Sequence, residues 1–268
     1  MDDFLPGIRY RMPVGFGPAV GPRQRADGQP WDDPMARIEV TAVSFLTDPA
    51  HLRRLLPPGL DLDGEPVVSI ELMRISELQW LAGRGYCTLG VRFPGRCAGK
   101  TRTFRGPFLA VLWENMADPI ITGREELGFA KLYCDIPPPR SLEGRRCHVA
   151  SWEGHRFMTM VVEGLVPSNA GSAVGDGTLH YRYVPAVGAG GAAQVKGVVV
   201  TPPAPRTELI DHACGQGTVR FHKSTWEELP TLHHIVNALA DLPVLESRGA
   251  TVSNVRTDTS LHNHFVVE

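Results

Sequence analysis

A lysine on a short predicted strand is the residue of this chain best suited to covalent chemistry. Segment 118–136, DPIITGREELGFAKLYCDI, predicts a helix that ends at Gly128 in the left-handed conformation, followed by a strand. Alternate side chains of a strand share a face, so Phe129, Lys131 and Tyr133 are expected on one side. Burial among aromatic neighbours would lower the pKa of this lysine, and a neutral amine can attack a ketone to form a Schiff base. From the residues alone, an exposed surface lysine is the more frequent case.

A second candidate for chemistry is Glu71, in the apolar predicted strand 66–75. It is expected to share a strand face with Val67, Ser69 and Met73. A carboxylate there is either a general acid or base in a cavity, or a structural acid paired with a cation. We favour the first, because aldol and dehydration steps need a well-placed group that transfers protons.

Four further side chains surround the predicted lysine strand in the sequence. Arg124 and Glu125 lie in the preceding helix, where they either contact substrate or form an ion pair that supports the strand. We favour the supporting role, although arginine is well suited to binding carboxylates. Trp113 and Glu114 lie just before that helix, and a place in the pocket and a purely structural role are equally open.

The elements that must position these residues are short strands. The chain has 28 glycines and 23 prolines, spread along its length, which indicates many turns. We predict an α+β domain over residues 36–268, mostly antiparallel and closed or curled, after an irregular arm over 1–35 that packs on the body or on a neighbouring subunit. Helices are predicted over 48–56, 118–127 and 229–242. Strands are predicted over 38–46, 66–75, 85–93, 107–113, 129–136, 146–152, 155–163, 178–184, 195–201, 206–211, 217–222 and 244–255.

Composition excludes several classes of protein. The 27 basic residues against 29 acidic ones give a formal charge of −2, which argues against nucleic-acid binding and a polybasic membrane anchor. The five cysteines form no CxxC pair, and no apolar signal segment or long apolar run is visible, so we expect reduced thiols and a cytoplasmic location. Ten histidines show no diagnostic ligand spacing, so we expect no metal site.

The lysine segment resembles the signature of the acetoacetate decarboxylase superfamily. The matching residues are Gly123-Arg124-Glu125 followed by Phe129-Ala130-Lys131, and the stretches 47–73 and 238–244 agree in order and spacing. The resemblance covers about residues 38–258. It implies a curled, cone-like β-barrel with a few peripheral helices, a Schiff-base role for Lys131, no organic cofactor or metal, and assembly into homo-oligomers.

The chain departs from the family pattern at charged positions. The family's decarboxylases carry a second lysine after the Schiff-base lysine, where this chain has Leu132. Their two active-site glutamates fall on Glu71 and on Thr88, so one acid is missing. Their carboxylate-binding arginine aligns near Ile38, and the adjacent Arg37 is a possible replacement.

We therefore predict a lyase in which Lys131 forms an imine with a small oxo acid. Glu71 is the second catalytic candidate, and the substrate-binding candidates are Arg124, Glu125, Arg37, Thr88, Trp113 and Phe129. Because two decarboxylase hallmarks are replaced, aldol condensation and dehydration on pyruvate-like 2-oxo acids rank above decarboxylation of acetoacetate or another β-keto acid. A non-catalytic protein that binds a small ligand is the remaining alternative.

Overall fold

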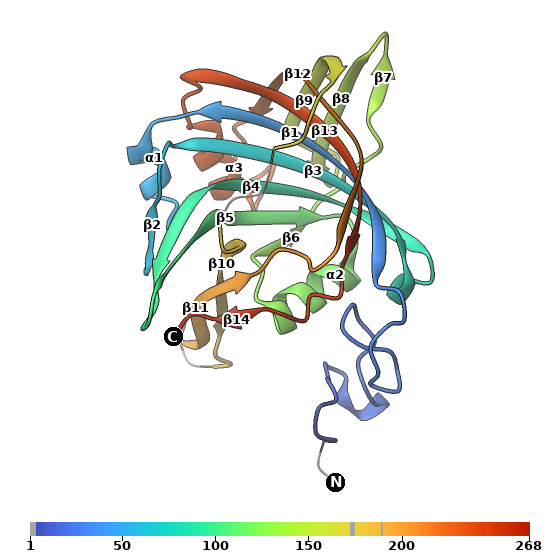
Figure 1. Ribbon diagram of the computed structural model, residues 1–268. Helices are drawn as coiled ribbons and strands as arrows, with labels where there is room; N and C mark the ends of the chain where they lie inside the picture. Colours follow the sequence, from blue (N-terminus) through green and yellow to red (C-terminus); the bar gives the residue numbers. More distant parts are fainter. Residues whose placement is uncertain (1–3, 172–174, 189) are drawn as a thin grey trace.

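The computed structural model describes residues 4–171, 175–188 and 190–268 of the chain. Residues 4–34 are irregular apart from one 3-10 turn, Val14–Phe16, and this segment extends from one end of the molecule (Figure 1). No described helix is long and apolar enough to cross a membrane.

One large sheet dominates the described chain. Its strands are β1 (Met35–Leu46), β2 (Leu60–Leu62), β3 (Val67–Leu78), β4 (Arg84–Ala98), β5 (Thr103–Glu114), β6 (Lys131–Tyr133), β7 (Arg140–Leu142), β8 (Arg145–Trp152), β9 (His155–Pro167), β10 (Thr178–Pro185), β11 (Ala193–Thr201), β12 (Thr207–Phe221), β13 (Glu246–Asp258) and β14 (Phe265–Val266). The order along the sheet is β14-β11-β10-β5-β4-β3-β1-β13-β12-β9-β8-β7, with β2 paired to β4 and β6 to β5. The pairs are antiparallel except β5–β10 and β5–β6.

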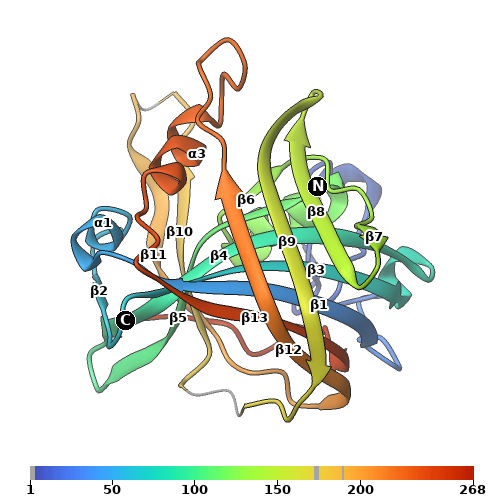
Figure 2. The same cartoon turned by 90° about the horizontal axis from the view of Figure 1, so that it is seen from above.

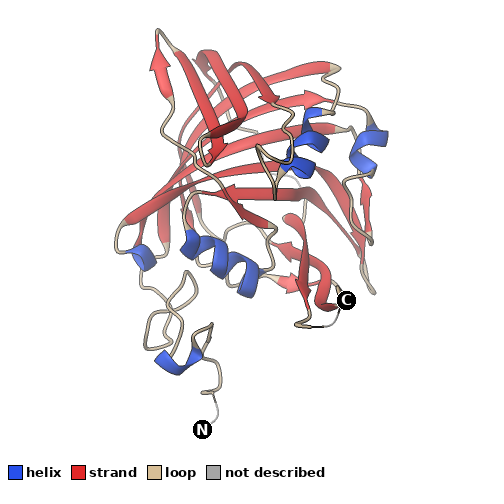
Figure 3. Cartoon of the chain, turned by 180° about the vertical axis from the view of Figure 1, so that it is seen from behind, coloured by secondary structure: helices blue, strands red, loops and turns tan. Residues whose placement is uncertain are grey.

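The sheet is curled, with few helices around it (Figures 2 and 3). The terminal strands β14 and β7 are not paired with each other in the described chain, so the sheet is open. The α-helices are α1 (Pro49–Arg53), α2 (Ala117–Thr122) and α3 (His233–Ala240). The prediction of a mostly antiparallel, curled β-domain with a few helices is confirmed.

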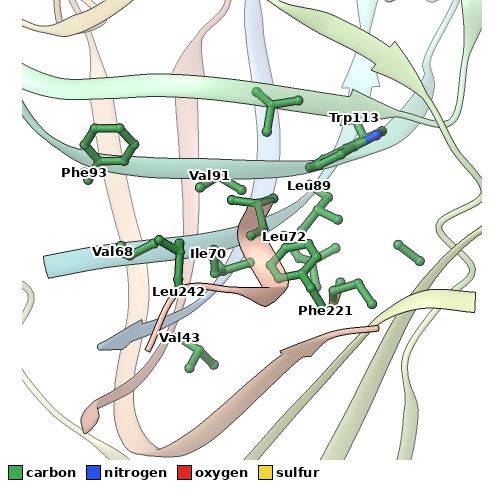
Figure 4. Close-up of a cluster of buried hydrophobic side chains, with 14 of the residues drawn as sticks. Val43, Val68, Ile70, Leu72, Leu89, Val91, Phe93, Trp113, Phe221 and Leu242 are labelled. Atoms are coloured by element: carbon green, nitrogen blue, oxygen red, sulfur yellow. The ribbon is translucent and has the colours of Figure 1, made fainter. Parts of the chain in front are cut away.

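The two faces of the sheet are packed differently. The larger apolar cluster includes Val68, Ile70, Leu72 and Trp113, and lies around α3 (Figure 4). A smaller cluster of Ala36, Ile38, Ile75 and Leu78 belongs to the opposite face, where Met73 and Trp80 pack against it. In β3, residues 68, 70 and 72 thus face the larger core, and residues 73 and 75 face the other way, as strand geometry requires.

Local sequence accounts for one helix start and one hairpin turn. Asp48 caps α1 by accepting a hydrogen bond from the Ala50 amide at 2.7 Å, with Pro49 in the first turn. Glu153 and Gly154 both have positive φ and join β8 to β9 as a tight hairpin.

The structure differs from the prediction in several elements. The sequence does not predict β2, β7 or β14, and the predicted helix 48–56 has α-helical geometry only over Pro49–Arg53. The predicted strands 206–211 and 217–222 form one bulged strand, β12, because β13 and β9 pair with it along its length. The predicted helix 229–242 has α-helical geometry only over His233–Ala240, after a turn. The predicted strand 129–136 shortens to β6, since its partner β5 ends at Glu114.

Candidate active site

Lys131 is buried at the wall of a cavity of about 240 Å³. Its side chain is 7% exposed, and its Nζ lies 2.8 Å from Oε1 of Glu114. The same Nζ donates a hydrogen bond to the Pro119 carbonyl at 2.9 Å. A buried amine with a carboxylate beside it has the composition of a proton-transfer pair.

The pairing of β6 with β5 brings these two residues together. The strands run parallel, with Lys131 beside Leu112 and Tyr133 beside Glu114. Leu112, Glu114 and Lys131 line the cavity, whereas Trp113, which alternates with them on β5, packs into the core.

A glycine makes the space for the lysine side chain. A Cβ added at Gly123 would lie 2.4 Å from Cδ and Cε of Lys131 and 2.6 Å from its Nζ. Gly123 ends α2 and begins a π-helical turn, Gly123–Leu127, which closes at Gly128 with φ of 79°. The predicted left-handed glycine is therefore confirmed, and the need for glycine at position 123 is steric.

The turn also holds the backbone of the lysine strand. Arg124 donates through Nη1 to the Lys131 carbonyl at 2.8 Å, and the Phe129 amide donates to the Gly123 carbonyl at 3.0 Å. The ring of Phe129 lies 5.6 Å from the lysine Nζ, and such a ring face favours a cation.

Glu114 is buried almost completely, with 1% of its side chain exposed. Burial raises the pKa of this carboxyl, and the charge and hydrogen bond of Lys131 partly offset the rise. Its Oε2 has no hydrogen-bond partner within the described part of the chain. Tyr86 also lines the cavity, and desolvation together with the Glu114 carboxylate raises its pKa, so its phenol stays neutral.

A buried histidine, His180, packs against the ring of Phe129. The ring of His180 stacks on Phe129 with centroids 4.1 Å apart. Its Nδ1 lies 3.1 Å from the Gly128 carbonyl and its Nε2 lies 2.9 Å from Oγ1 of Thr201. The carbonyl requires a donor, so the proton is on Nδ1 and the threonine donates to Nε2. Burial lowers the pKa of His180 to about 3, with smaller contributions from other groups that include Arg92 and Lys131.

The remaining lining of the cavity is mainly apolar. The apolar members are Pro22, Ile38, Met73, Ile75, Leu78, Trp80, Leu109, Leu112, Pro119, Leu127, Ala204 and Leu261. Arg92 is the one described cation besides Lys131, and Asp258 is the one described carboxylate besides Glu114. This lining favours a small organic molecule with few charged groups.

A larger chamber of about 570 Å³ adjoins the lysine cavity. The two share Met73, Arg92, Thr257, Asp258 and Leu261 among their lining residues. The lysine cavity and the larger chamber thus lie side by side.

The irregular N-terminal segment closes part of the site. Arg11 and Arg23 form ion pairs with Glu126 at 2.9 and 3.0 Å. Pro22 lines the lysine cavity. The segment therefore packs against the turn that carries Gly123.

Three of the eight predicted site residues line one cavity. These are Lys131, Thr88 and Phe129. Thr88 is buried and lies directly opposite Glu114 in the β4–β5 ladder. The carboxylate missing at position 88 thus has a counterpart on the adjacent strand.

The other predicted residues lie outside this lining. Glu71 has the predicted strand face but lies farther along β3, in a neighbouring cavity, with Oε2 2.9 Å from Nε of Arg92. Arg37 is exposed on β1, next to Ile38, which lines the lysine cavity. Trp113 is fully buried in the larger core.

Arg124 and Glu125 line a separate cavity near Tyr10 and Arg182. Arg124 has the supporting contact described above, and the Glu125 carbonyl accepts a hydrogen bond from Arg182 at 2.6 Å.

Sequence reasoning missed Arg92 and Tyr86. The alternation of β4 offers a signal, because Thr88, Gly90 and Arg92 are spaced by two and oppose Met73, Glu71 and Ser69 of β3. Among the described residues, no three His, Cys, Asp or Glu side chains are grouped to hold a metal ion.

Comparison with known proteins agrees with this architecture. The family "Acetoacetate decarboxylase (ADC)" matches residues 12–265, and no curated protein matches the chain. An acetoacetate decarboxylase from Legionella pneumophila superposes with a TM-score of 0.67 at 18% identity, covering 85% of this chain and 88% of its own. An acetoacetate decarboxylase-like enzyme from Sphingomonas wittichii RW1 gives 0.63 at 19% identity, covering 87% and 94%.

The enduracididine biosynthesis enzyme MppR, in its complex with pyruvate, has the same fold. It gives a TM-score of 0.67 at 18% identity, covering 87% of this chain and 90% of its own. The likeness of these structures shows the fold, and the sequence match extends over nearly the whole chain. The chain belongs to the acetoacetate decarboxylase family.

Proposed function

We propose that this protein is a lyase that joins a small 2-oxo acid to an aldehyde through an imine on Lys131. The observation that carries the proposal is the buried pair of Lys131 and Glu114, 2.8 Å apart, at the wall of an apolar cavity. Membership of the acetoacetate decarboxylase family supports an enzyme of this general kind.

Glu114 is suited to prepare the lysine for attack. Burial favours its protonated form, so the carboxylate can take a proton from the Lys131 ammonium and leave a neutral amine. The amine nitrogen then attacks the ketone carbon, and the ketone oxygen becomes the hydroxyl of a carbinolamine. Return of the proton from Glu114 to that hydroxyl releases water and leaves a protonated imine.

The same carboxylate can serve the carbon chemistry. The protonated imine acts as an electron sink, so Glu114 can remove a proton from the adjacent carbon and give an enamine. The enamine carbon attacks the aldehyde carbon, and the aldehyde oxygen takes up the proton. Loss of this hydroxyl as water gives the unsaturated product, and hydrolysis of the imine frees Lys131.

The larger chamber favours condensation over decarboxylation. It adjoins the lysine cavity and adds about 570 Å³, which is room for a second reactant. Decarboxylation of a small β-keto acid needs no second reactant. One structure of MppR holds "the condensation product of pyruvate and imidazole 4-carboxaldehyde", which shows that this fold can accommodate such a product.

Imine trapping tests the proposal. The wild-type protein and Lys131→Ala are each incubated with pyruvate and reduced with borohydride. Intact-mass spectrometry then measures the mass of each protein. We expect one reduced pyruvate on the wild type and none on the variant. No adduct on the wild type, or an equal adduct on Lys131→Ala, would contradict the imine and favour a ligand-binding protein.

The reaction itself is tested by two parallel assays. Pyruvate with an aromatic aldehyde should give a conjugated product that is followed by ultraviolet absorbance, and Lys131→Ala should give none. Release of CO2 from acetoacetate without any condensation product would instead identify a decarboxylase.

A further inference from the structure

Arg92 lies where three cavities meet. It lines the lysine cavity, the larger chamber and the neighbouring cavity that contains Glu71. We propose that Arg92 binds the carboxylate of the oxo acid and that Glu71 is a positioning residue that orients it. This inference rests on the proposed imine chemistry and assigns its substrate selectivity to a single side chain.

The guanidinium of Arg92 is held by two contacts, and some of its N–H donors have no partner within the described chain. Its Nε lies 2.9 Å from Oε2 of Glu71, and its Nη1 donates to Oγ1 of Thr178 at 2.9 Å. The Nε–Oε2 contact is an ion pair without hydrogen-bond geometry, so only one of the five N–H donors of this arginine, on Nη1, is used in a hydrogen bond within the described chain. Within the described chain, no hydrogen bond involves Nη2. The planar edge of Nη1 and Nη2 matches the two oxygens of a carboxylate.

The geometry of the sheet sets this arrangement. Gly90 lies opposite Glu71 in the β3–β4 ladder, and Arg92 lies opposite Ser69. Because Gly90 has no side chain, Glu71 can reach diagonally to Arg92 on the same face. The contact places Nε of Arg92 toward Glu71, so the edge formed by Nη1 and Nη2 faces away from Glu71.

No other described arginine is placed for this role. Ile38 lines the cavity where the family resemblance locates a carboxylate-binding arginine, so that position is uncharged. Arg37 is exposed and absent from the lining, and Arg124 donates to the Lys131 backbone from a separate cavity. Arg92 is therefore the cation available to an anionic substrate bound at Lys131.

The acidic residues of the lining also favour a substrate carboxylate beside Arg92. Glu114 is occupied by Lys131, and Oδ1 of Asp258 accepts the Ser260 amide at 2.7 Å. The Asp258 carboxylate repels an anion, so the favourable place for the substrate carboxylate is beside Arg92.

The test compares two ketones that differ only in the carboxylate. Pyruvate and acetone both present a methyl ketone, and borohydride trapping gives the half-saturating concentration of each. For Arg92→Gln we expect this concentration to rise roughly ten- to hundredfold for pyruvate, since a charge-assisted bond is lost. Acetone should be trapped as before. Arg37→Gln is the matched control and should change neither value.

Glu71→Gln tests the positioning role. It keeps Arg92 charged but weakens its orientation, so we expect a smaller rise for pyruvate, again with acetone unchanged. Arg92→Lys retains the charge without the planar fork and should fall between wild type and Arg92→Gln. It also keeps the test available if Arg92→Gln fails to fold.

The possible failures are distinguishable. If the wild type traps neither ketone, the proposed imine chemistry is wrong. If the wild type traps both and Arg92→Gln retains the wild-type preference for pyruvate, Arg92 is not the selectivity residue and the imine chemistry stands. An equal loss of both ketones in a folded Arg92→Gln would also overturn the role, because the effect would not depend on the carboxylate.

Discussion

The two faces of strand β5 have opposite properties. On one face, Trp113 is fully buried, with its ring 5.5 Å from that of Phe157 and 6.4 Å from that of Phe221. On the other, Leu112 and Glu114 border an open volume of about 240 Å³. Neighbouring residues thus belong separately to the packed core and to the cavity wall, because strand side chains alternate between faces.

Truncation on the packed face should give the largest effect on stability. Trp113→Ala should lower the free energy of unfolding by about 3–5 kcal/mol, since it leaves a cavity in the core. Urea unfolding followed by circular dichroism measures this loss. The folded fraction of the variant should still trap pyruvate. A destabilisation below about 1 kcal/mol would break the proposed division between the faces.

On the open face, Glu114→Gln should act on rate. Loss of the proton-transfer group should slow imine formation about a hundredfold or more, equivalent to about 3 kcal/mol. Rapid quench with borohydride measures this rate. Glu125→Gln is the matched control, because Glu125 lies outside the cavity lining. Equal rates in both variants would remove Glu114 from the mechanism.

Gly123, which contacts the Lys131 side chain, gives a third comparison. Gly123→Ala places a methyl group against the Lys131 side chain, so we expect a stability loss of about 1–3 kcal/mol and weaker pyruvate trapping. Thermal melting and intact-mass analysis measure the two effects. Gly15→Ala, at a position with open space around its Cβ, should change neither. Normal trapping by Gly123→Ala would show that the lysine can move without loss.

Acid should weaken the support behind Phe129. The pKa of His180 is about 3 in the folded protein against an ordinary value of 6.5, so the unfolded chain binds a proton first. Its stabilising contribution is present above pH 6.5 and falls as the pH drops toward 3. Between pH 7 and pH 5 the loss is about 2 kcal/mol. Urea unfolding at both pH values should show less loss for His180→Asn than for the wild type.

The sequence predicts the parts of this site that depend on local geometry. The strand period of two predicts that Phe129 and Lys131 share a face, and both line the same cavity. The helix pattern predicts the left-handed conformation of Gly128. The parallel pairing of β5 with β6, which places Glu114 at the lysine, depends on tertiary contacts. The sequence alone therefore leaves position 114 open between a pocket role and a structural one.

Two other positions show that a small shift along a strand changes the partner of a side chain. A shift of one residue separates Ile38, which lines the cavity, from Arg37, which is exposed. Glu71 has the predicted face, but its distance along β3 places it against Arg92 rather than Lys131. Periodicity gives the face of a side chain, and only the register and length of neighbouring strands give its partner.

The cavity lining combines residues that are far apart along the chain, from Pro22 to Leu261. During synthesis, the segment near Pro22 emerges first, and its partner Glu126 follows about a hundred residues later. Leu261 is made only when the sheet is nearly complete. The pocket therefore needs residues that are far apart along the chain, and a chain truncated before Leu261 would carry the lysine without its full lining.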